Sequence, residues 1–233
     1  MLQSIKLLYG RALGAQDGEI GRVKDFYFDD EEWVVRYVVV DTGSWLPGRQ
    51  VLLSPHAFVN VPAAGKPLVV NLTRKQVENS PAIGLHKPVS RQYEEEYHRH
   101  YGWPFYWQGG NMWGANPFPV GPAPGKEQIA ESGGHEDRAA GHLRSTQAVN
   151  GYHVRASDGT AGHVCDFMLD AKSWAITQLV IKTGHRLSGK EVQMPSSAVS
   201  EISYDESTLI VSLTKDSIER SPAMVLEPAG RAD

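Results

Sequence analysis

The chain has 233 residues, of which 41% are hydrophobic and 21% charged, so it can hold one large domain or two small ones. Its formal net charge of -4 excludes a strongly basic nucleic-acid-binding protein, because neutralising phosphates needs clustered Lys and Arg. The single cysteine, Cys165, excludes a disulfide framework and a cysteine-rich metal cluster.

The first residues show no basic start leading into a long apolar run, so we expect no signal peptide. The most apolar stretch, residues 34–40, is interrupted by Arg36 and is far shorter than the roughly 20 residues that a membrane-spanning helix needs. We therefore expect a cytoplasmic protein.

The first third of the chain is rich in strand signals. Residues 19–28 and 34–40 combine β-branched and aromatic side chains, and Asp17-Gly18 precedes them as a turn. Shorter strands are expected at 51–53, 58–61 and 68–72, separated by Gly and Pro. Thr73 then caps a short helix over 74–79, which Pro81 ends.

The central segment combines a helix with an unusual density of aromatic side chains. Ser90 is placed to cap a helix that runs to Tyr101, and tyrosines recur every four residues on one face of it. Residues 93–118 hold nine of the 21 aromatic residues of the chain. Gly and Pro then dominate through residue 125, and residues 126–142 are typical of a polar tether.

Three interpretations of this aromatic segment stay open. It covers a surface of the folded domains or joins them; it forms a partner-binding or self-association patch, since Trp and Tyr are enriched at interface hot spots; or it stacks single-stranded nucleic acid, which the lack of a basic groove disfavours. The candidate partner-binding residues are Tyr93, Tyr97, Tyr101, Trp103, Phe105, Trp107 and Trp113. Trp45, in a predicted loop over 43–48, is either a further anchor or a plug at the end of a domain.

The last third of the chain repeats the first. Residues 10–82 align with residues 151–223 at a constant offset of 141, with 25 identities in 73 positions and no insertion. Strands are therefore expected near 160–170, 175–183, 190–194, 199–203 and 208–213, with a helix after Thr214. The predicted units are residues 1–84 and 143–226, joined by a linker over 85–142 and followed by a tail over 227–233.

The shared motif of the two copies reads as structural. It consists of Asp17, Gly18, Gly21 and Asp25 in the first copy and of Asp158, Gly159, Gly162 and Asp166 in the second. Glycine in turns and strands usually answers a backbone need, and no phosphate-binding loop surrounds these positions. We expect Asp25 and Asp166 to accept hydrogen bonds from nearby backbone amides.

The sequence predicts no catalytic, cofactor or metal site. The nine histidines are scattered and form neither His-Glu-x-x-His nor another metal-binding spacing. His98 and His100 would point to different faces of the central helix. Cys165 and His163 lie two residues apart on one strand face, but we expect an inert thiol rather than an activated nucleophile.

The repeated pattern Asp-Gly-x-x-Gly-x-Val-x-Asp-Phe, at residues 17–26 and 158–167, resembles the PRC-barrel family. The resemblance implies a mainly β protein of two small PRC-like β-barrels, each with a short C-terminal helix, joined by the aromatic helix and the Gly/Pro-rich linker. The family's barrel occurs in the cytoplasmic part of the H subunit of the purple-bacterial photosynthetic reaction centre. It also occurs in a ribosome maturation factor, where it helps to hold a ribosomal protein.

These relatives imply a bacterial, non-enzymatic protein that serves in protein–protein interaction or assembly. Its partner would be another protein or a second copy of the chain. The first alternative is an accessory role in photosynthetic electron transfer, with peripheral contact to a membrane complex. The second alternative is association with ribosomes or RNA processing.

Overall fold

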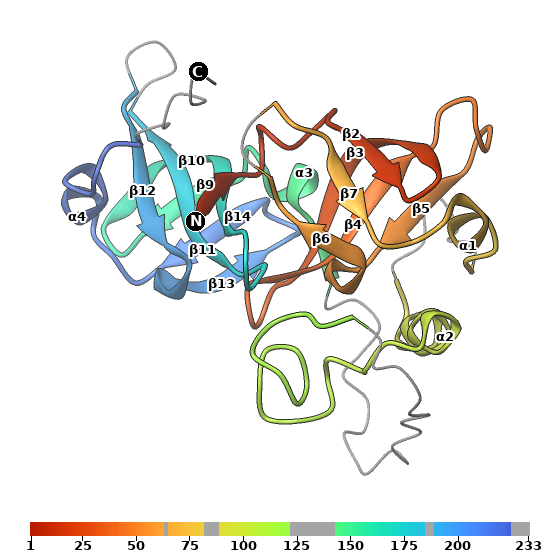
Figure 1. Ribbon diagram of the computed structural model, residues 1–233. Helices are drawn as coiled ribbons and strands as arrows, with labels where there is room; N and C mark the ends of the chain where they lie inside the picture. The colour runs from red at the N-terminus through yellow and green to blue at the C-terminus, as the bar shows by residue number, and fades with distance from the viewer. Residues whose placement is uncertain (63–64, 82–88, 122–142, 185–188, 225–233) are drawn as a thin grey trace.

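A computed structural model describes residues 1–62, 65–81, 89–121, 143–184 and 189–224. The chain is mainly β, and its strands form two sheets of seven strands each (Figure 1). This confirms the predicted class and is consistent with two β domains. No helix in the described ranges is both long enough and apolar enough to span a membrane.

The first sheet has the strand order β5-β4-β3-β2-β7-β6, with β8 paired to β3 beside this path. Its strands are β2 (Ala12–Ala15), β3 (Gly18–Asp29), β4 (Val34–Asp41), β5 (Gln50–Leu53), β6 (Phe58–Asn60), β7 (Leu68–Val70) and β8 (Leu143–Ser145). The pairing is antiparallel except between β2 and β7, which are parallel.

The second sheet repeats this topology, with the order β12-β11-β10-β9-β14-β13 and β1 paired to β10. Its strands are β1 (Leu2–Ser4), β9 (His153–Ala156), β10 (Gly159–Asp170), β11 (Ile176–Thr183), β12 (Glu191–Pro195), β13 (Val199–Ser203) and β14 (Thr208–Val211). Here β9 and β14 form the parallel pair. The internal repeat in the sequence thus corresponds to two sheets of the same connectivity.

Six short helical elements complete the described fold. They are η1 (Pro55–Ala57), α1 (Arg74–Glu78), α2 (Arg91–Tyr101), α3 (Thr146–Val149), η2 (Ser196–Ala198) and α4 (Lys215–Glu219). The predicted Thr caps are confirmed, because Thr73 and Thr214 accept hydrogen bonds from the backbone amides of Gln76 and Ser217.

The two aspartates that open the repeated motif have a local structural role. Asp17 accepts a hydrogen bond from the backbone amide of Arg74 at 2.7 Å, and Asp158 accepts one from the amide of Lys215 at 2.8 Å. Each carboxylate therefore satisfies a free amide at the start of a short helix, α1 or α4, where negative charge is also favourable.

The two halves exchange their first strands. The N-terminal strand β1 pairs with β10 of the second sheet, and β8, which opens the second half, pairs with β3 of the first sheet. The pairing is equivalent in both cases, since Ser4 lies opposite Met168 and Ser145 lies opposite Tyr27, each pair at the offset of the repeat. Each sheet is therefore completed by a strand from the other half of the sequence.

Asp25 and Asp166 fasten these exchanged strands. Asp25 accepts hydrogen bonds from the hydroxyl of Ser145, the hydroxyl of Thr146 and the backbone amide of Gln147. Asp166 accepts them from the hydroxyl of Ser4 and the backbone amide of Lys6.

The prediction of a purely local role for these two aspartates was incomplete. Each carboxylate does accept from the amide that follows it in its own strand, but its other partners belong to the opposite half. Burial raises the pKa of both carboxyl groups, and these hydrogen bonds oppose the rise.

The halves also meet where two tryptophan turns, both part of the shared hydrophobic core, exchange backbone hydrogen bonds. Trp33 and Trp174 occupy equivalent turns with positive φ of 55° and 62°. The carbonyl of Trp174 accepts from the amide of Val35, and the carbonyl of Trp33 accepts from the amide of Ile176.

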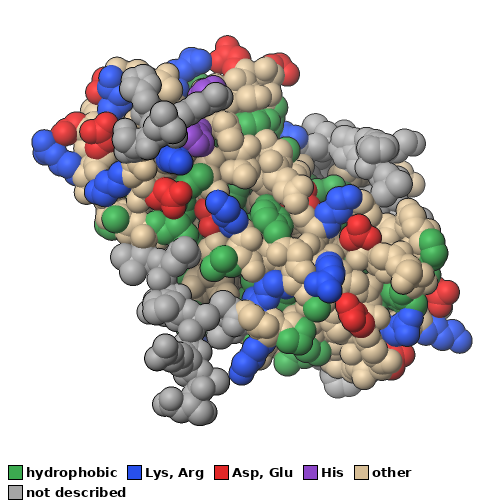
Figure 2. Space-filling model, turned by 90° about the horizontal axis from the view of Figure 1, so that it is seen from above, with side chains coloured by type: hydrophobic (Ala, Val, Ile, Leu, Met, Phe, Trp, Pro, Cys, Tyr) green, Lys and Arg blue, Asp and Glu red, His purple; other side chains and the backbone are tan. Residues whose placement is uncertain are grey.

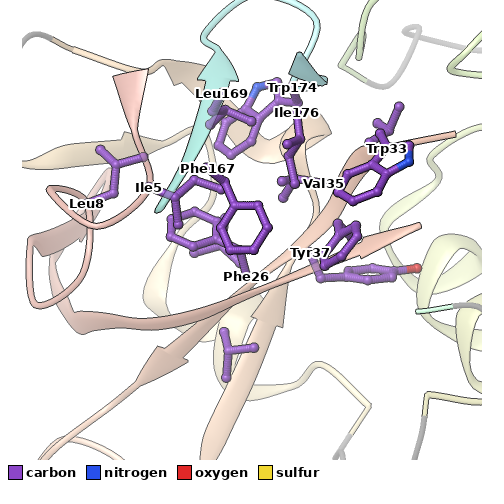
Figure 3. Packing of buried hydrophobic residues seen from close by; sticks show 14 of the residues in the cluster. Ile5, Leu8, Phe26, Trp33, Val35, Tyr37, Phe167, Leu169, Trp174 and Ile176 are labelled. Carbon is purple, nitrogen blue, oxygen red and sulfur yellow. The ribbon is translucent and has the colours of Figure 1, made fainter. Parts of the chain in front are cut away.

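Surface charge is mixed, whereas the core between the halves is apolar. Figure 2 shows Lys, Arg, Asp and Glu side chains interspersed on the face seen from above. Figure 3 shows the buried side chains that lie between the two sheets, among them Phe26, Phe167, Val35 and Ile176. Burial of this apolar surface adds to the strand pairing and the aspartate hydrogen bonds that join the halves.

Two glycines of the motif permit close packing of neighbouring strands. Gly21 and Gly162 have φ of 145° and 153°. A Cβ atom at either position would collide with the carbonyl oxygen of the adjacent strand, Asp41 or Lys182. This confirms a backbone need at Gly21 and Gly162.

Candidate functional site: the aromatic segment

The aromatic segment, residues 89–121, begins with the predicted helix. α2 starts after Ser90, whose hydroxyl accepts from the backbone amide of Tyr93 at 3.2 Å, and it ends at Gly102 with φ of 68°. In Figure 1, α2 and the loop after it lie together on one side of the two sheets. This arrangement places the helix and loop against β4 and β5 of the first sheet.

The tyrosine stripe of α2 docks on the first sheet. Tyr97 is fully buried; its hydroxyl donates to the carbonyl of Leu52 at 2.8 Å and accepts from the amide of Ser54 at 3.2 Å. Its ring stands edge-on to Tyr37 of β4, with centroids 5.4 Å apart. The tyrosine stripe of α2 and the first sheet therefore pack as one unit.

A buried polar cluster lies beneath the helix. The carboxylate of Glu94, which is 0% exposed, accepts from the hydroxyls of Tyr106 at 2.6 Å and Tyr37 at 3.1 Å. The guanidinium of Arg91 lies 3.1 Å from its other oxygen. A buried carboxylate is tolerated only when it is paired and hydrogen-bonded in this way.

Arg36 of β4 brings a second charge into the same interface. Its guanidinium is buried, lies 3.9 Å from the ring centre of Tyr106 and 5.0 Å from that of Trp113, and donates to the carbonyl of Met112 at 2.6 Å. It also pairs with Glu32 at 3.0 Å. The loop after α2 is thus ordered around a cation that β4 supplies.

Two buried histidines of the cluster are uncharged at neutral pH. Burial lowers the pKa of His98 to about 3 and that of His56 to about 4. The Nδ1 atom of His98 lies 2.9 Å from the carbonyl of Pro104, and that of His56 lies 2.6 Å from the carbonyl of Val120. Because a carbonyl oxygen only accepts, each Nδ1 carries the proton.

The end of the segment reaches the second half of the molecule. The indole of Trp113, which is fully buried, donates to the carbonyl of Ser173 at 2.8 Å. The ammonium of Lys172 lies 4.3 Å from the ring centre of Phe118. The segment therefore spans from the first sheet to the hairpin turn between β10 and β11.

The equivalent surface of the second sheet carries no such covering among the described residues. Thr177 and Gln178 stand at the positions of Arg36 and Tyr37, and they are exposed and half-buried. The difference was readable in the sequence, because β4 is apolar along most of its length whereas β11 has two adjacent polar residues, Thr177 and Gln178, near its start. A strand that is apolar on both faces predicts a cover on both faces.

The structure divides the predicted partner-binding residues into two groups. Tyr97, Trp103 and Trp113 are buried, which supports the interpretation that the segment covers a sheet and joins the halves. The other five candidates are half-buried, namely Trp45, Tyr93, Tyr101, Phe105 and Trp107. Trp45 lies against α1, with the guanidinium of Arg74 4.7 Å from its ring centre.

The comparisons with known proteins concern the first half. Residues 11–77 match the family model described as the PRC-barrel domain. No curated protein matches the chain. Residues 11–77 form a PRC-barrel domain.

Three features of the structure lie outside this PRC-barrel domain. The match includes β2 to β7 and most of α1, but it leaves out β1, β8 and the whole aromatic segment. The exchanged strands β1 and β8 and the aromatic covering therefore lie outside the matched residues.

A small cavity opens where the segment meets the PRC-barrel domain. Its volume is about 250 Å³, and it has no Asp, Glu, Lys or Arg in its lining. The lining includes His56, Asn71, Asn79, Tyr101, Trp103 and Gly121. Such a mixed lining suits a small uncharged group.

Cys165 is the side chain that the sequence analysis weighed as a nucleophile. Burial raises the pKa of its thiol to about 11, so the thiol is protonated at neutral pH and is a poor nucleophile. It stands at an irregularity in the pairing of β10 with β11. Within the described residues there is also no group of three or more His, Cys, Asp or Glu side chains arranged to hold a metal.

Proposed function

We propose that this protein is a non-enzymatic assembly adaptor built from two PRC-type barrels in tandem, which binds a partner protein through the outer face of the aromatic segment. The tandem is supported by the internal repeat, by the identical strand order of the two sheets, and by the family match of the first copy. The parallel pairs β2–β7 and β9–β14 bring late strands back beside early ones, as closing each sheet into a barrel requires.

The observation that carries the proposal is a half-buried aromatic and arginine patch on the segment. Phe105 and Trp107 stack with ring centroids 4.8 Å apart. The guanidinium of Arg91 lies 4.2 Å from the ring centre of Trp107, and that of Arg99 lies 5.8 Å from Phe105. Trp and Arg are the residue types most enriched at binding hot spots.

The surroundings of the patch favour binding over a purely structural role. The buried members of the segment anchor it to the sheet, whereas Phe105 and Trp107 are half-buried and pack with one side on the ring of His98, with centroids 6.0 and 5.4 Å apart. A rigid support lowers the entropy lost on binding, because the side chains that contact the partner are already ordered.

The test begins with co-purification of the full chain from its native cells and continues with the isolated partner. We expect the double variant Phe105→Ser/Trp107→Ser to weaken partner binding at least tenfold and to lower the melting temperature less than Tyr97→Ser does, because both side chains are half-buried whereas Tyr97 is fully buried. Binding is measured by titration calorimetry and folding by circular dichroism.

Two control variants make the result specific. Tyr152→Ser removes a half-buried aromatic of the second half and should leave binding unchanged. Tyr97→Ser removes a buried anchor and should lower thermal stability. The proposal is wrong if no partner is retained by the native chain, or if the double variant binds the partner as tightly as the native chain does.

A further inference from the structure

A row of polar side chains crosses the outer face of the second sheet. His153 of β9 lies opposite His163 of β10, which lies opposite Lys182 of β11, and Lys182 in turn lies opposite Glu191 of β12. The next residues along these strands, such as Val154 and Val164, are fully buried. Because side chains alternate between the faces of a sheet, the row of histidines faces outward.

The pairing type brings the two histidines close together. The amide of His153 donates to the carbonyl of Ser207, which directly precedes β14, and the amide of Val164 donates to the carbonyl of Tyr152. His153 and His163 therefore form a non-hydrogen-bonded pair, the type in which facing side chains are closest. The Cβ atoms of such pairs are about 4.5–5.5 Å apart.

Both imidazoles lie at the surface of the part of the chain that the structure describes. His153 is exposed and His163 is half-buried. Within the described part of the chain, neither ring takes part in a hydrogen bond, an ion pair or an aromatic contact.

We propose that His153 and His163 form a surface binding site for a late first-row divalent metal ion. Two facing imidazoles can each place a nitrogen about 2.0–2.1 Å from a shared ion. Nitrogen ligands favour Cu²⁺ over Ni²⁺ and Zn²⁺ and do not suit Mg²⁺ or Ca²⁺. Two protein ligands leave the other coordination positions open to water or to a group from a second molecule.

The charges that face the pair set limits on the site. Lys182 lies next to His163 and opposes a cation, and Glu191 lies opposite Lys182 and balances that charge. Imidazole binds metal only when it is unprotonated, so binding must weaken as the solution becomes acidic.

The first sheet supplies a natural comparison. The equivalent row there consists of Ala12, Arg22, Asp41 and Gln50, paired in the same register. It has the same backbone geometry but no imidazole. Within the two equivalent rows, the pair of ligands is a property of the second copy alone.

The experiment titrates the full chain, without an affinity tag, with CuCl₂ at neutral pH by calorimetry and electron paramagnetic resonance. We expect one site with nitrogen ligation, which His153→Ala or His163→Ala weakens at least tenfold. His100→Ala removes an exposed histidine of α2 and should leave the site unchanged. The double variant Ala12→His/Arg22→His should add a second site of similar affinity.

Three results would overturn the proposal. The first is Cu²⁺ binding by His153→Ala and His163→Ala with the affinity of the native chain. The second is equal loss of binding in His100→Ala, because the ion would then lie elsewhere. The third is a native chain without any nitrogen-ligated Cu²⁺ signal.

Discussion

At the scale of single residues, the interface between the first sheet and the aromatic segment contains two histidines that burial keeps uncharged. His56 is 5% exposed, and burial lowers its pKa from 6.5 to about 4. An unfolded chain releases this histidine to water, where its pKa is ordinary. Acid therefore favours the unfolded state.

We predict that replacing His56 removes part of the acid sensitivity of the fold. The stabilising contribution of the neutral ring is complete above about pH 6.5 and declines as the pH falls toward 4. Because the unfolded chain binds this proton more readily, the free energy of unfolding of the native chain falls by about 2 kcal/mol through this group between pH 8 and pH 5. Urea unfolding of the native chain and of His56→Gln, compared at pH 8 and pH 5, measures the difference.

The native chain and His56→Gln contain the same carboxyl groups. The difference between their changes in unfolding free energy therefore isolates the contribution of His56. His56→Gln is expected to be less stable at pH 8 and to lose less stability on acidification. If both proteins lose the same free energy of unfolding between the two pH values, His56 does not contribute to acid sensitivity.

The residues of this interface differ in how far the sequence revealed them. The stripe of Tyr93, Tyr97 and Tyr101 followed from helical spacing, and the structure confirms its packing. The partners Arg36 and His56 were not predicted, because they come from distant elements, β4 and η1, and no periodicity links them to the helix. A lone arginine in an apolar strand was the one local sign that something had to pair with it.

At the scale of elements, the long strands were predictable and the exchanged strands were not. Residues 19–28 and 34–40 have the composition and length of strands, and they are β3 and β4. β1 and β8 have three residues each, too few for a periodic pattern, and their partners lie in the other half. The identity of Ser4 and Ser145 at the repeat offset was the available signal.

We predict that the two fastening aspartates are equally important for stability. Asp25→Ala and Asp166→Ala each leave hydroxyl and amide donors of an exchanged strand unpaired, which costs about 2–4 kcal/mol in total. Asp205→Ala, at an exposed position, should change stability by less than about 0.5 kcal/mol. Urea unfolding at pH 7 measures all three.

Hydrogen exchange locates the effect along the chain. In Asp25→Ala the amides of β8 and α3 should exchange faster, and in Asp166→Ala the amides of β1 should do so. An unchanged stability in either variant, or faster exchange away from the exchanged strands, contradicts this account of Asp25 and Asp166.

At the scale of the whole molecule, strand exchange makes the two halves interdependent. Each sheet needs a strand from the other half. The ring centroids of Phe167, in the second half, and Phe28, in the first, are 6.0 Å apart. The aromatic segment adds a third link through Trp113 and Ser173. The predicted units over 1–84 and 143–226 describe the repeat in the sequence, but each of them contains a strand that completes the other sheet.

This interdependence predicts a single unfolding transition. Two independent barrels would melt separately, whereas halves that share a core and exchange strands lose both sheets together. Phe167→Ala removes a side chain that is 1% exposed and should cost about 3–5 kcal/mol. Calorimetry should show one peak in both proteins, shifted downward in the variant, and amides of β4 and β11 should lose protection equally. Two peaks, or loss of protection confined to β11, would show that the halves unfold independently despite the exchange.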